Sequence, residues 1–252
     1  MAVAPPAPLH VGVFGRGRLG SAVAAEVGSR AQSTALAWHL TRETPSPPQP
    51  DVVIECSAAA GVAVHLAWAL EHRRPLVIGS TGWSIPDLAD QVRGRIPVLV
   101  APNFSLGMAM LLRLTTVLAR FAAADATRDP YIIEHHHARK HDSPSGTAKL
   151  LAQAILTGCP RKTGVTVGGP VGPESLSVGV VRAGTTYSSH VVGIDAPGEV
   201  IELSHAARSF KPYAEGAVTA AWWLTTGKAP GVYGMDDVAK DLLDPLFRSP
   251  LA

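Results

Sequence analysis

The side chains best suited to chemistry lie between positions 135 and 141, where four histidines, an arginine and a lysine occur together. A histidine with such neighbours can donate a proton near neutral pH. A helix is predicted to start just after them with Ser145 as its N-cap, so the backbone N–H groups of Gly146 and Thr147 can bind a carboxylate. Lys140 adds a positive point charge. This combination predicts a small carboxylate substrate that is protonated during the reaction.

Two other interpretations of the histidines compete with this one. Adjacent residues of a strand point to opposite faces, so His135 and His137 could share a zinc ion while His136 points away. No H-E-x-x-H helix or nearby cysteine pair completes such a site, and we therefore expect no metal. The second alternative is a solvated basic loop without chemistry.

A glycine-rich segment near the start of the chain has the spacing of a dinucleotide-binding turn. It stands between an apolar stretch at 9–14, a predicted strand, and an alanine-rich stretch at 21–27, a predicted helix. Glycines allow a tight turn and a close approach of the backbone to a pyrophosphate, while the helix N-terminus supplies N–H groups. The alternative is a purely structural turn. The cofactor-binding residues predicted here are Gly15, Arg16, Gly17, Arg18, Leu19 and Gly20.

The choice between the two nicotinamide cofactors depends on residues about 20 positions after the last glycine. Thr41 and Arg42 occupy the end of the second predicted strand and favour the 2′-phosphate of NADPH. Arg16 and Arg18 could add positive charge. We therefore expect NADPH as the preferred cofactor, with NADH possible. Glu43 leaves an alternative open, because a strand that ends one or two residues later would place this carboxylate at the ribose.

The first hundred residues alternate between short apolar segments and helical segments. We predict strands at 9–14, 35–40, 52–55, 76–78 and 98–100, and helices at 21–27, 62–71 and 87–92. The strands are apolar throughout rather than at alternate positions, as in a parallel sheet that is covered on both faces. The pattern predicts an α/β fold with a Rossmann-type doubly wound domain over residues 1–103.

The pattern changes after Asn103. We predict a long apolar helix at 106–123, a strand at 131–134, a helix at 145–156, strands at 176–182, 187–192 and 200–204, and a helix at 213–223. The last three strands have no helices between them, which favours a mostly antiparallel sheet in an α+β domain. We expect residues 104–226 to form this second domain and residues 227–252 to return to the first.

Composition excludes several classes of protein. Of the 252 residues, 46% are hydrophobic and 17% charged, and 22 basic against 20 acidic residues leave a net charge of +2. This balance indicates a globular protein, and a net charge so near zero does not by itself imply a nucleic-acid surface, so we expect no nucleic-acid partner. Two cysteines, Cys56 and Cys159, favour a reducing compartment. We find no secretion signal and no uninterrupted apolar stretch of the roughly 20 residues that a membrane span needs, so we predict a soluble cytoplasmic protein.

Residues 134–148 resemble the signature of the 4-hydroxy-tetrahydrodipicolinate reductase family, the dihydrodipicolinate reductases of lysine and diaminopimelate biosynthesis. The residues that match in order and spacing are Glu134, His136, His137, Lys140, Asp142, Pro144, Ser145, Gly146, Thr147 and Ala148. Further matching blocks are Gly79 to Gly82, Ala101 to Gly107, Arg182 to Gly184, His190 and Glu215 to Ala217. The resemblance covers essentially the whole chain.

The resemblance implies an NAD(P)H-dependent reduction of 4-hydroxy-tetrahydrodipicolinate, a small dicarboxylate, to tetrahydrodipicolinate. His136 would be the proton donor, and Lys140 would share in proton delivery. The substrate would be bound by His137, Lys140, Ser145, Gly146 and Thr147, and the nicotinamide by Gly79, Ser80, Thr81, Ala101, Pro102, Asn103 and Phe104. The family also implies a homotetramer built through the sheets of the second domain.

The chain departs from the family pattern at a few positions. Ser188 stands where the family has glycine in a Gly-x-His strand motif, and Phe210 follows Ser209 where an arginine is common. These departures keep two alternatives open. One is a related imine reductase that acts on a different cyclic carboxylate, and the other is a nucleotide-binding protein without turnover.

Overall fold

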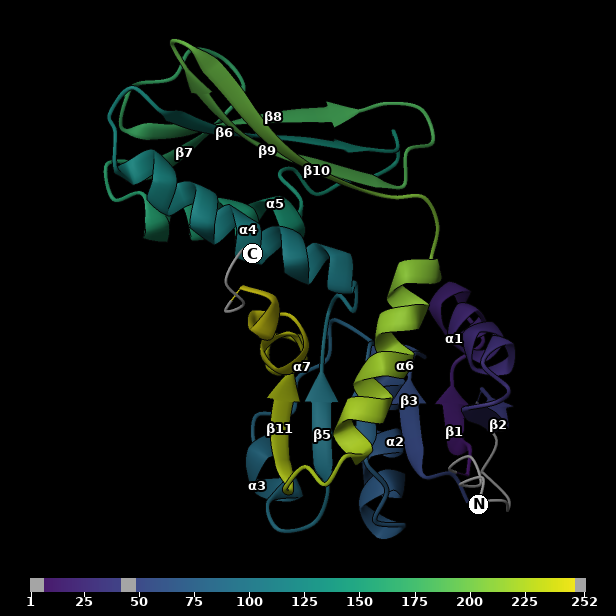
Figure 1. The fold of residues 1–252 in the computed structure, drawn as a ribbon. Coiled ribbons are helices and arrows are strands. Elements are labelled where there is room, and N and C mark those ends of the chain that lie inside the picture. Colours follow the sequence, from purple (N-terminus) through teal and green to yellow (C-terminus); the bar gives the residue numbers. More distant parts are fainter. Residues whose placement is uncertain (1–6, 42–48, 248–252) are drawn as a thin grey trace, which may run out of the picture. The chain divides into compact units, whose positions relative to one another are not determined.

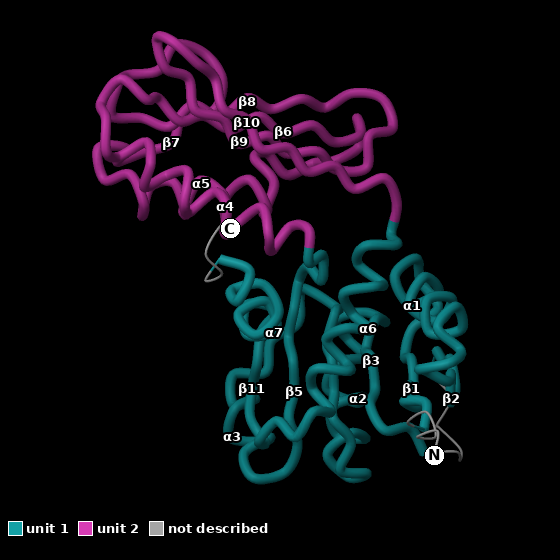
Figure 2. Tube along the Cα trace, in the orientation of Figure 1, with its two compact units in different colours: residues 1–106, 210–252 teal, residues 107–209 magenta. Residues whose placement is uncertain are grey.

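The computed structural model describes residues 7–41 and 49–247. Figure 2 shows its two compact units. The first contains residues 1–106 and 210–252, and the second contains residues 107–209. The second unit is therefore an insertion in the sequence of the first.

The first unit is built on six parallel strands (Figure 1). The strand order is β11-β5-β4-β3-β1-β2, and the strands are β1 (Leu9–Phe14), β2 (Thr34–Leu40), β3 (Val52–Glu55), β4 (Leu76–Ile78), β5 (Pro97–Val100) and β11 (Gly231–Gly234). All neighbouring pairs run in parallel. The predicted doubly wound sheet is confirmed, and β11 is an additional edge strand.

Helices cover both faces of this sheet because its strands are apolar on both faces. Helices α1 (Arg18–Ser29), α6 (Lys211–Thr225) and α7 (Met235–Leu242) pack on one face, and α2 (Ala59–Glu71) and α3 (Leu88–Val92) pack on the other. Along β3, Val52 and Ile54 belong to the first core and Val53 to the second. This is the alternation expected of side chains along a strand.

Helix α6 belongs to the first unit, whereas the boundary expected at residue 226 placed it in the second. Ala217, Ala221 and Leu224 are buried in the same core as strand β3. A Cβ atom on Gly216 would lie only 1.8 Å from the carbonyl oxygen of Phe104, so the helix backbone packs directly on the segment after β5. Helix α6 packs on the first sheet because the apolar side chains of this sheet face would otherwise be exposed to water.

The second unit contains a five-stranded mixed sheet. Its order is β10-β9-β6-β8-β7, and the strands are β6 (Asp129–His136), β7 (Gly164–Val167), β8 (Ser175–Arg182), β9 (Ser188–Ala196) and β10 (Glu199–Ala207). Strand β9 pairs antiparallel with β6 and β10, but β8 pairs in parallel with β6 and β7. The expected antiparallel arrangement therefore holds for β9 and β10 and not for β8. Strand β6 lies between β8 and β9, so the sequence neighbours β8 and β9 never pair.

Helices α4 (Leu106–Ala123) and α5 (Gly146–Gly158) cover one face of the second sheet. Leu111 of α4 and Leu151 of α5 pack against Ile132 and Val192 of the sheet. Helix α4 is long and apolar enough to cross a membrane by length and composition alone. Core helices of globular proteins meet the same two criteria.

Candidate active site

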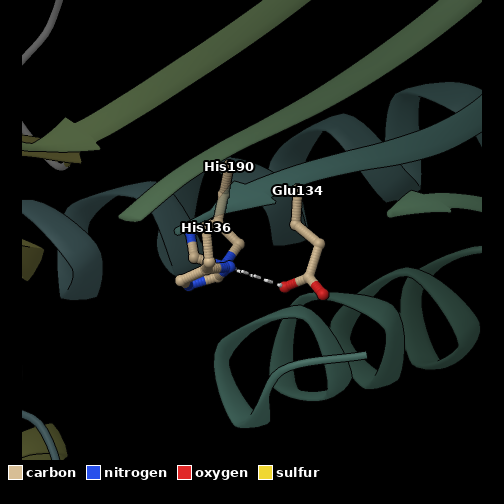
Figure 3. Close-up of side chains that lie close together, drawn as sticks. All are labelled: Glu134, His136 and His190. Atoms are coloured by element: carbon tan, nitrogen blue, oxygen red, sulfur yellow. Dashed lines mark ion pairs between the residues drawn. The ribbon is translucent and has the colours of Figure 1, made fainter. Parts of the chain in front are cut away.

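Three buried ionisable side chains meet on the helix-covered face of the second sheet (Figure 3). Glu134 and His136 stand two residues apart on β6 and so point to the same face, while the register of β6 with β9 places His190 opposite Glu134. Oε2 of Glu134 lies 3.6 Å from Nδ1 of His136 and 3.5 Å from Nε2 of His190. The exposed fractions of the three side chains are 0%, 6% and 1%. A carboxylate and two imidazoles thus share one buried site.

The second oxygen of Glu134 is held by two donors. Oε1 accepts hydrogen bonds from the backbone N–H of Ser145 at 3.0 Å and from Nη2 of Arg182 at 2.7 Å. Nη2 of Arg182 also donates to the carbonyl oxygen of Asp142 at 2.7 Å. These bonds join β6, the end of β8 and the start of α5 around one carboxylate.

The surroundings set the protonation state of the three groups. Burial would raise the pKa of Glu134, but hydrogen bonds from Ser145 and Arg182 hold it below its usual value, so the carboxylate is ionised. Burial lowers the pKa of His136, although the charge of Glu134 opposes this effect. Burial and the nearby charge of His136 lower the pKa of His190 to about 4, so its ring is neutral near pH 7.

Helix α5 begins at this cluster with Ser145 as its N-cap, as predicted. Oγ of Ser145 accepts from the backbone N–H of Ala148 at 3.1 Å and lies 3.2 Å from Nε2 of His190. The buried Ser145 side chain is therefore engaged within the protein. The N–H groups of Gly146 and Thr147 belong to the first turn, where no intrahelical acceptor exists, and the Gly146 position is exposed. This end of α5 suits an anion.

His137 and Lys140 lie on the turn after β6, where the backbone N–H of Lys140 donates to the carbonyl oxygen of His137 at 3.1 Å. Nζ of Lys140 is 2.7 Å from Oδ1 of Asp142, and this hydrogen bond lowers the pKa of Asp142. The positive charge of Lys140 also contributes to the lowered pKa of His136. The second unit therefore gathers all the residues predicted for catalysis and substrate binding.

In the first unit, the glycine turn connects β1 to α1. Gly15 has a φ of +101°, and a Cβ atom there would lie 2.4 Å from the carbonyl oxygen of Cys56. A Cβ atom on Gly20 would lie 1.9 Å from the carbonyl oxygen of Gly15, whereas a Cβ atom on Gly17 would meet nothing within 4 Å. The first and third glycines are thus required by packing, and the second faces open space, as a pyrophosphate approaching the backbone requires.

Helix α1 has no acidic residue in its first turn and no side chain that caps its N-terminus, so its N–H groups suit a phosphate. Arg16 donates to the carbonyl oxygen of His39 at 2.7 Å through Nη2, which fixes its guanidinium beside the end of β2. Thr41 directly follows this strand, and Arg18 stacks on Phe210 with 5.1 Å to the ring centroid. Arg42 and Glu43 lie outside the described residues.

The loops predicted for the nicotinamide follow the next strands of the sheet. Gly79, Ser80 and Thr81 follow β4, and the segment 101–104 follows β5. Carboxyl ends of parallel strands lie at one edge of a sheet, so these loops share an edge with the glycine turn. A Cβ atom on Gly79 would lie 2.7 Å from the ring of Phe104, which shows that the two loops touch. A hollow of about 460 Å³, lined in part by Leu9, lies at the opposite edge.

Four polar residues near these sites have no role that the sequence alone predicts. Glu134, Arg182 and His190 matched the family pattern but received no role, although each is a polar residue in a largely apolar strand. Glu55 at the end of β3 was missed entirely. Its buried carboxylate accepts a hydrogen bond from the backbone N–H of Ser57 at 2.9 Å, next to the glycine turn.

Two family models match this chain. The model for the N-terminus of dihydrodipicolinate reductase matches residues 40–104, and the model for its C-terminus matches residues 107–239. The 4-hydroxy-tetrahydrodipicolinate reductase of Chromohalobacter salexigens is 38% identical over 197 residues, which are 75% of this chain and 72% of the relative. That of Gluconacetobacter diazotrophicus is 38% identical over 203 residues, 76% of this chain and 77% of the relative.

Two solved structures have a similar fold. A dipicolinate-bound dihydrodipicolinate reductase from Paenisporosarcina sp. TG-14 matches with a TM-score of 0.67 and 19% identity, over 92% of this chain and 99% of that chain. A probable dehydrogenase from Thermotoga maritima matches with a TM-score of 0.54 and 12% identity, over 91% of this chain and 92% of that chain.

Proposed function

This chain belongs to the dihydrodipicolinate reductase family, and we propose that it reduces 4-hydroxy-tetrahydrodipicolinate to tetrahydrodipicolinate, with NADPH as the preferred reductant and His136 as the proton donor. The observation that carries the proposal is the position of His136. Its buried ring lies beside the ionised carboxylate of Glu134, on the same unit as a helix start that suits an anion.

The nucleotide fits the first unit. Packing requires Gly15 and Gly20, while the space in front of Gly17 is open at the N-terminus of α1. When bound, the reduced nicotinamide supplies the hydride for the reduction. Preference for NADPH is supported by Arg16, whose guanidinium is fixed at the end of β2 beside Thr41, where the ribose of a dinucleotide is expected.

The dicarboxylate substrate is held by the second unit. The N–H groups of Gly146 and Thr147 and the ammonium group of Lys140 bind one carboxylate, together with His137. Ser145 acts indirectly, because its side chain caps α5 and its backbone N–H orients Glu134. Substrate held in this way presents the atom to be protonated to a fixed donor, and such orientation is a large part of enzymatic rate enhancement.

Glu134 prepares His136 for proton donation. When the ring of His136 takes up a proton, the carboxylate 3.6 Å away stabilises the imidazolium. Burial lowers the pKa of His136 and so favours loss of this proton to the substrate. His136 therefore gives up its proton readily and can be reloaded between turnovers.

The proposal includes a homotetramer that assembles through the second sheet. Among the described elements of the second unit, none covers the face opposite α4 and α5, where Ile133, Val181 and Val200 are 41%, 41% and 58% exposed. Exposure of these apolar side chains to water is unfavourable, which favours association of this face with another copy of the chain. We expect Ile133→Glu to lower the sedimentation coefficient to that of a smaller assembly, and the matched Val64→Glu on helix α2 to leave it unchanged. A wild-type chain that sediments as a monomer would remove this part of the proposal.

The test of the activity is nicotinamide oxidation with substrate generated in the cuvette by the preceding synthase from pyruvate and aspartate semialdehyde. Oxidation of NADPH faster than NADH is expected. Equal or faster use of NADH would remove the NADPH preference and retain the enzyme. No oxidation of either cofactor, by protein that binds them, would contradict the proposed substrate.

A different cyclic imine carboxylate is the second candidate substrate. The observation that favours it is the position of Ser188, which departs from the family pattern. Its side chain is buried, and its Oγ lies 3.5 Å from Nδ1 of His190, next to the catalytic cluster. Ser188→Gly should leave kcat/KM for the dicarboxylate unchanged or higher if the dicarboxylate is the substrate. A loss of activity would point to a role of the hydroxyl in specificity.

A further inference from the structure

The cluster of Glu134, His136 and His190 contains two buried polar atoms without a hydrogen-bond partner among the described residues. They are Oε2 of Glu134 and Nδ1 of His136, which belong to side chains 0% and 6% exposed. Leaving a buried polar atom unpaired costs about 1–3 kcal/mol. Such atoms call for a partner of complementary chemistry, and here Oε2 of Glu134 lies 3.6 Å from Nδ1 of His136 and 3.5 Å from Nε2 of His190.

We propose that this cluster is a binding site for one Zn²⁺ ion, coordinated by Oε2 of Glu134 and by the rings of His136 and His190. The three ligand atoms lie within 4.8 Å of one another. Zinc binds nitrogen and oxygen ligands at about 2.0–2.2 Å, which separates the ligand atoms of a tetrahedral ion by about 3.3–3.6 Å. The two separations from Oε2, 3.6 and 3.5 Å, fall within this range.

The ligand types select the kind of cation. Two imidazoles and one carboxylate are ligands of zinc in proteins, whereas Mg²⁺ and Ca²⁺ prefer shells made of oxygen. Ser145 and Arg182 hold Oε1 of Glu134 and leave Oε2 directed at the ion, as the supporting residues of metal sites do. Three protein ligands leave the fourth position for water.

Zinc and the transferable proton are alternatives at this cluster. The ion takes the lone pair of Nδ1 of His136 and also binds Nε2 of His190, which without the ion lies 3.2 Å from Oγ of Ser145. An imidazole that binds a metal through one nitrogen cannot gain a second proton and form the imidazolium. The zinc-bound protein therefore lacks its proton donor. This inhibitory effect rests on the proposed function, but zinc binding itself does not.

The test is calorimetric titration of the chelator-treated full chain with ZnCl₂. We expect one ion per chain in the wild type, no saturable binding in Glu134→Gln and His190→Gln, and unchanged binding in His135→Gln. His135 is the matched control because it adjoins His136 on β6 but points to the opposite face. Wild-type protein without saturable binding, or His135→Gln without it while His190→Gln retains it, would overturn the site.

Titration with Co²⁺ keeps the inference testable if the variants do not fold. Wild-type protein should develop the intense visible absorption of four-coordinate cobalt, which Zn²⁺ then abolishes and Mg²⁺ does not. Absence of these bands would count against the site. In the reductase assay, Zn²⁺ should inhibit and a chelator should restore the rate. Active enzyme that binds no zinc overturns this inference alone, whereas zinc binding by a chain without reductase activity overturns the proposed function alone.

Discussion

Glu134 is the residue on which the polar contacts of the buried cluster with His136 and His190 converge. Its Oε1 accepts hydrogen bonds from Ser145 and Arg182, and its Oε2 lies within 3.6 Å of the rings of His136 and His190. Each partner comes from a different element, so a single carboxylate fixes the relative positions of groups that the chain brings together from four places. Replacement of such a buried, paired charge leaves its partners without compensation, which is more costly than the loss of any one contact.

His136→Gln should lower kcat by about 10²- to 10⁴-fold, the usual contribution of a general acid, because glutamine cannot donate the proton. The dissociation constant for NADPH should stay unchanged, since the predicted nucleotide contacts lie in the first unit. Steady-state kinetics and fluorescence titration measure the two quantities. His135→Gln is the control and should retain its kcat. A kcat for His136→Gln within twofold of the wild type would contradict the assignment of the proton donor.

The glycine turn gives a pair of substitutions that separate binding from folding. Gly17→Ala should keep the melting temperature, because the added methyl group meets nothing within 4 Å, yet it should weaken nucleotide binding by filling the space of the pyrophosphate. Gly15→Ala should lower the melting temperature, since φ is +101° and the methyl group would meet Cys56. Thermal unfolding with and without NADPH distinguishes them. Equal nucleotide affinity in Gly17→Ala and the wild type would argue against a pyrophosphate at this position.

The sequence predicts those site residues that lie close together along the chain, but not those that the fold brings together from distant positions. Glycine spacing and the alternation along β6 are visible in a few consecutive residues, so the glycine turn, His136 and the N-cap Ser145 could be expected. His190 could not be placed beside Glu134, because the contact depends on the register of two strands whose residues are 56 positions apart. The expectation that no metal binds rests on histidines, an H-E-x-x-H helix and cysteine pairs that lie close together in the sequence, and it therefore does not consider His190.

At the scale of elements, α6 is the helix that completes the first unit. Gly216→Ala should lower the melting temperature by several degrees, because its methyl group would overlap the carbonyl oxygen of Phe104. Gly28→Ala in α1 is the matched control, since nothing lies within 4 Å of its added methyl group. Alanine favours a helix over glycine by roughly 0.5–1 kcal/mol, so this control should be slightly more stable than the wild type. Equal melting temperatures for the two variants would contradict the direct backbone contact of α6.

Element types were predictable where an apolar run was long, as in α4 or β1. The four-residue strands β7 and β11 were missed, because both begin with glycine and offer too few side chains for a pattern. The sequence also could not predict to which unit α6 belongs. Its apolar face fits any sheet, and only the uncovered face of the first sheet decides where it packs.

At the scale of the whole molecule, stability should fall as the pH drops from about 6.5 toward 4. The pKa of His190 is lowered to about 4 in the folded chain, so between these values the unfolded chain binds more protons than the folded one. Full stability is present above the ordinary histidine pKa, and the loss is at most about 1.4 kcal/mol per pH unit for this one group. The lowered pKa of His136 acts in the same direction.

Two optical probes can assign this acid sensitivity to one unit. All five tryptophans lie in the first unit, so their fluorescence follows that unit, whereas far-ultraviolet circular dichroism follows both. Between pH 7 and 5, the urea midpoint from circular dichroism should shift more than the midpoint from fluorescence. The difference should shrink in His190→Asn. Identical shifts from the two probes in the wild type would show that the buried histidines do not control the second unit.

The insertion of residues 107–209 within the first unit has a consequence for synthesis on the ribosome. Five strands of the first sheet emerge early, but α6, one of the helices that cover them, ends at residue 225. At about 5–20 residues per second, the 119 residues between positions 106 and 225 take roughly 6–24 s to appear. The inserted unit has all its strands by residue 207 and can fold within that interval. The first unit begins synthesis first and is completed last, so the part of its sheet face that α6 will cover is the surface that a chaperone would have to protect.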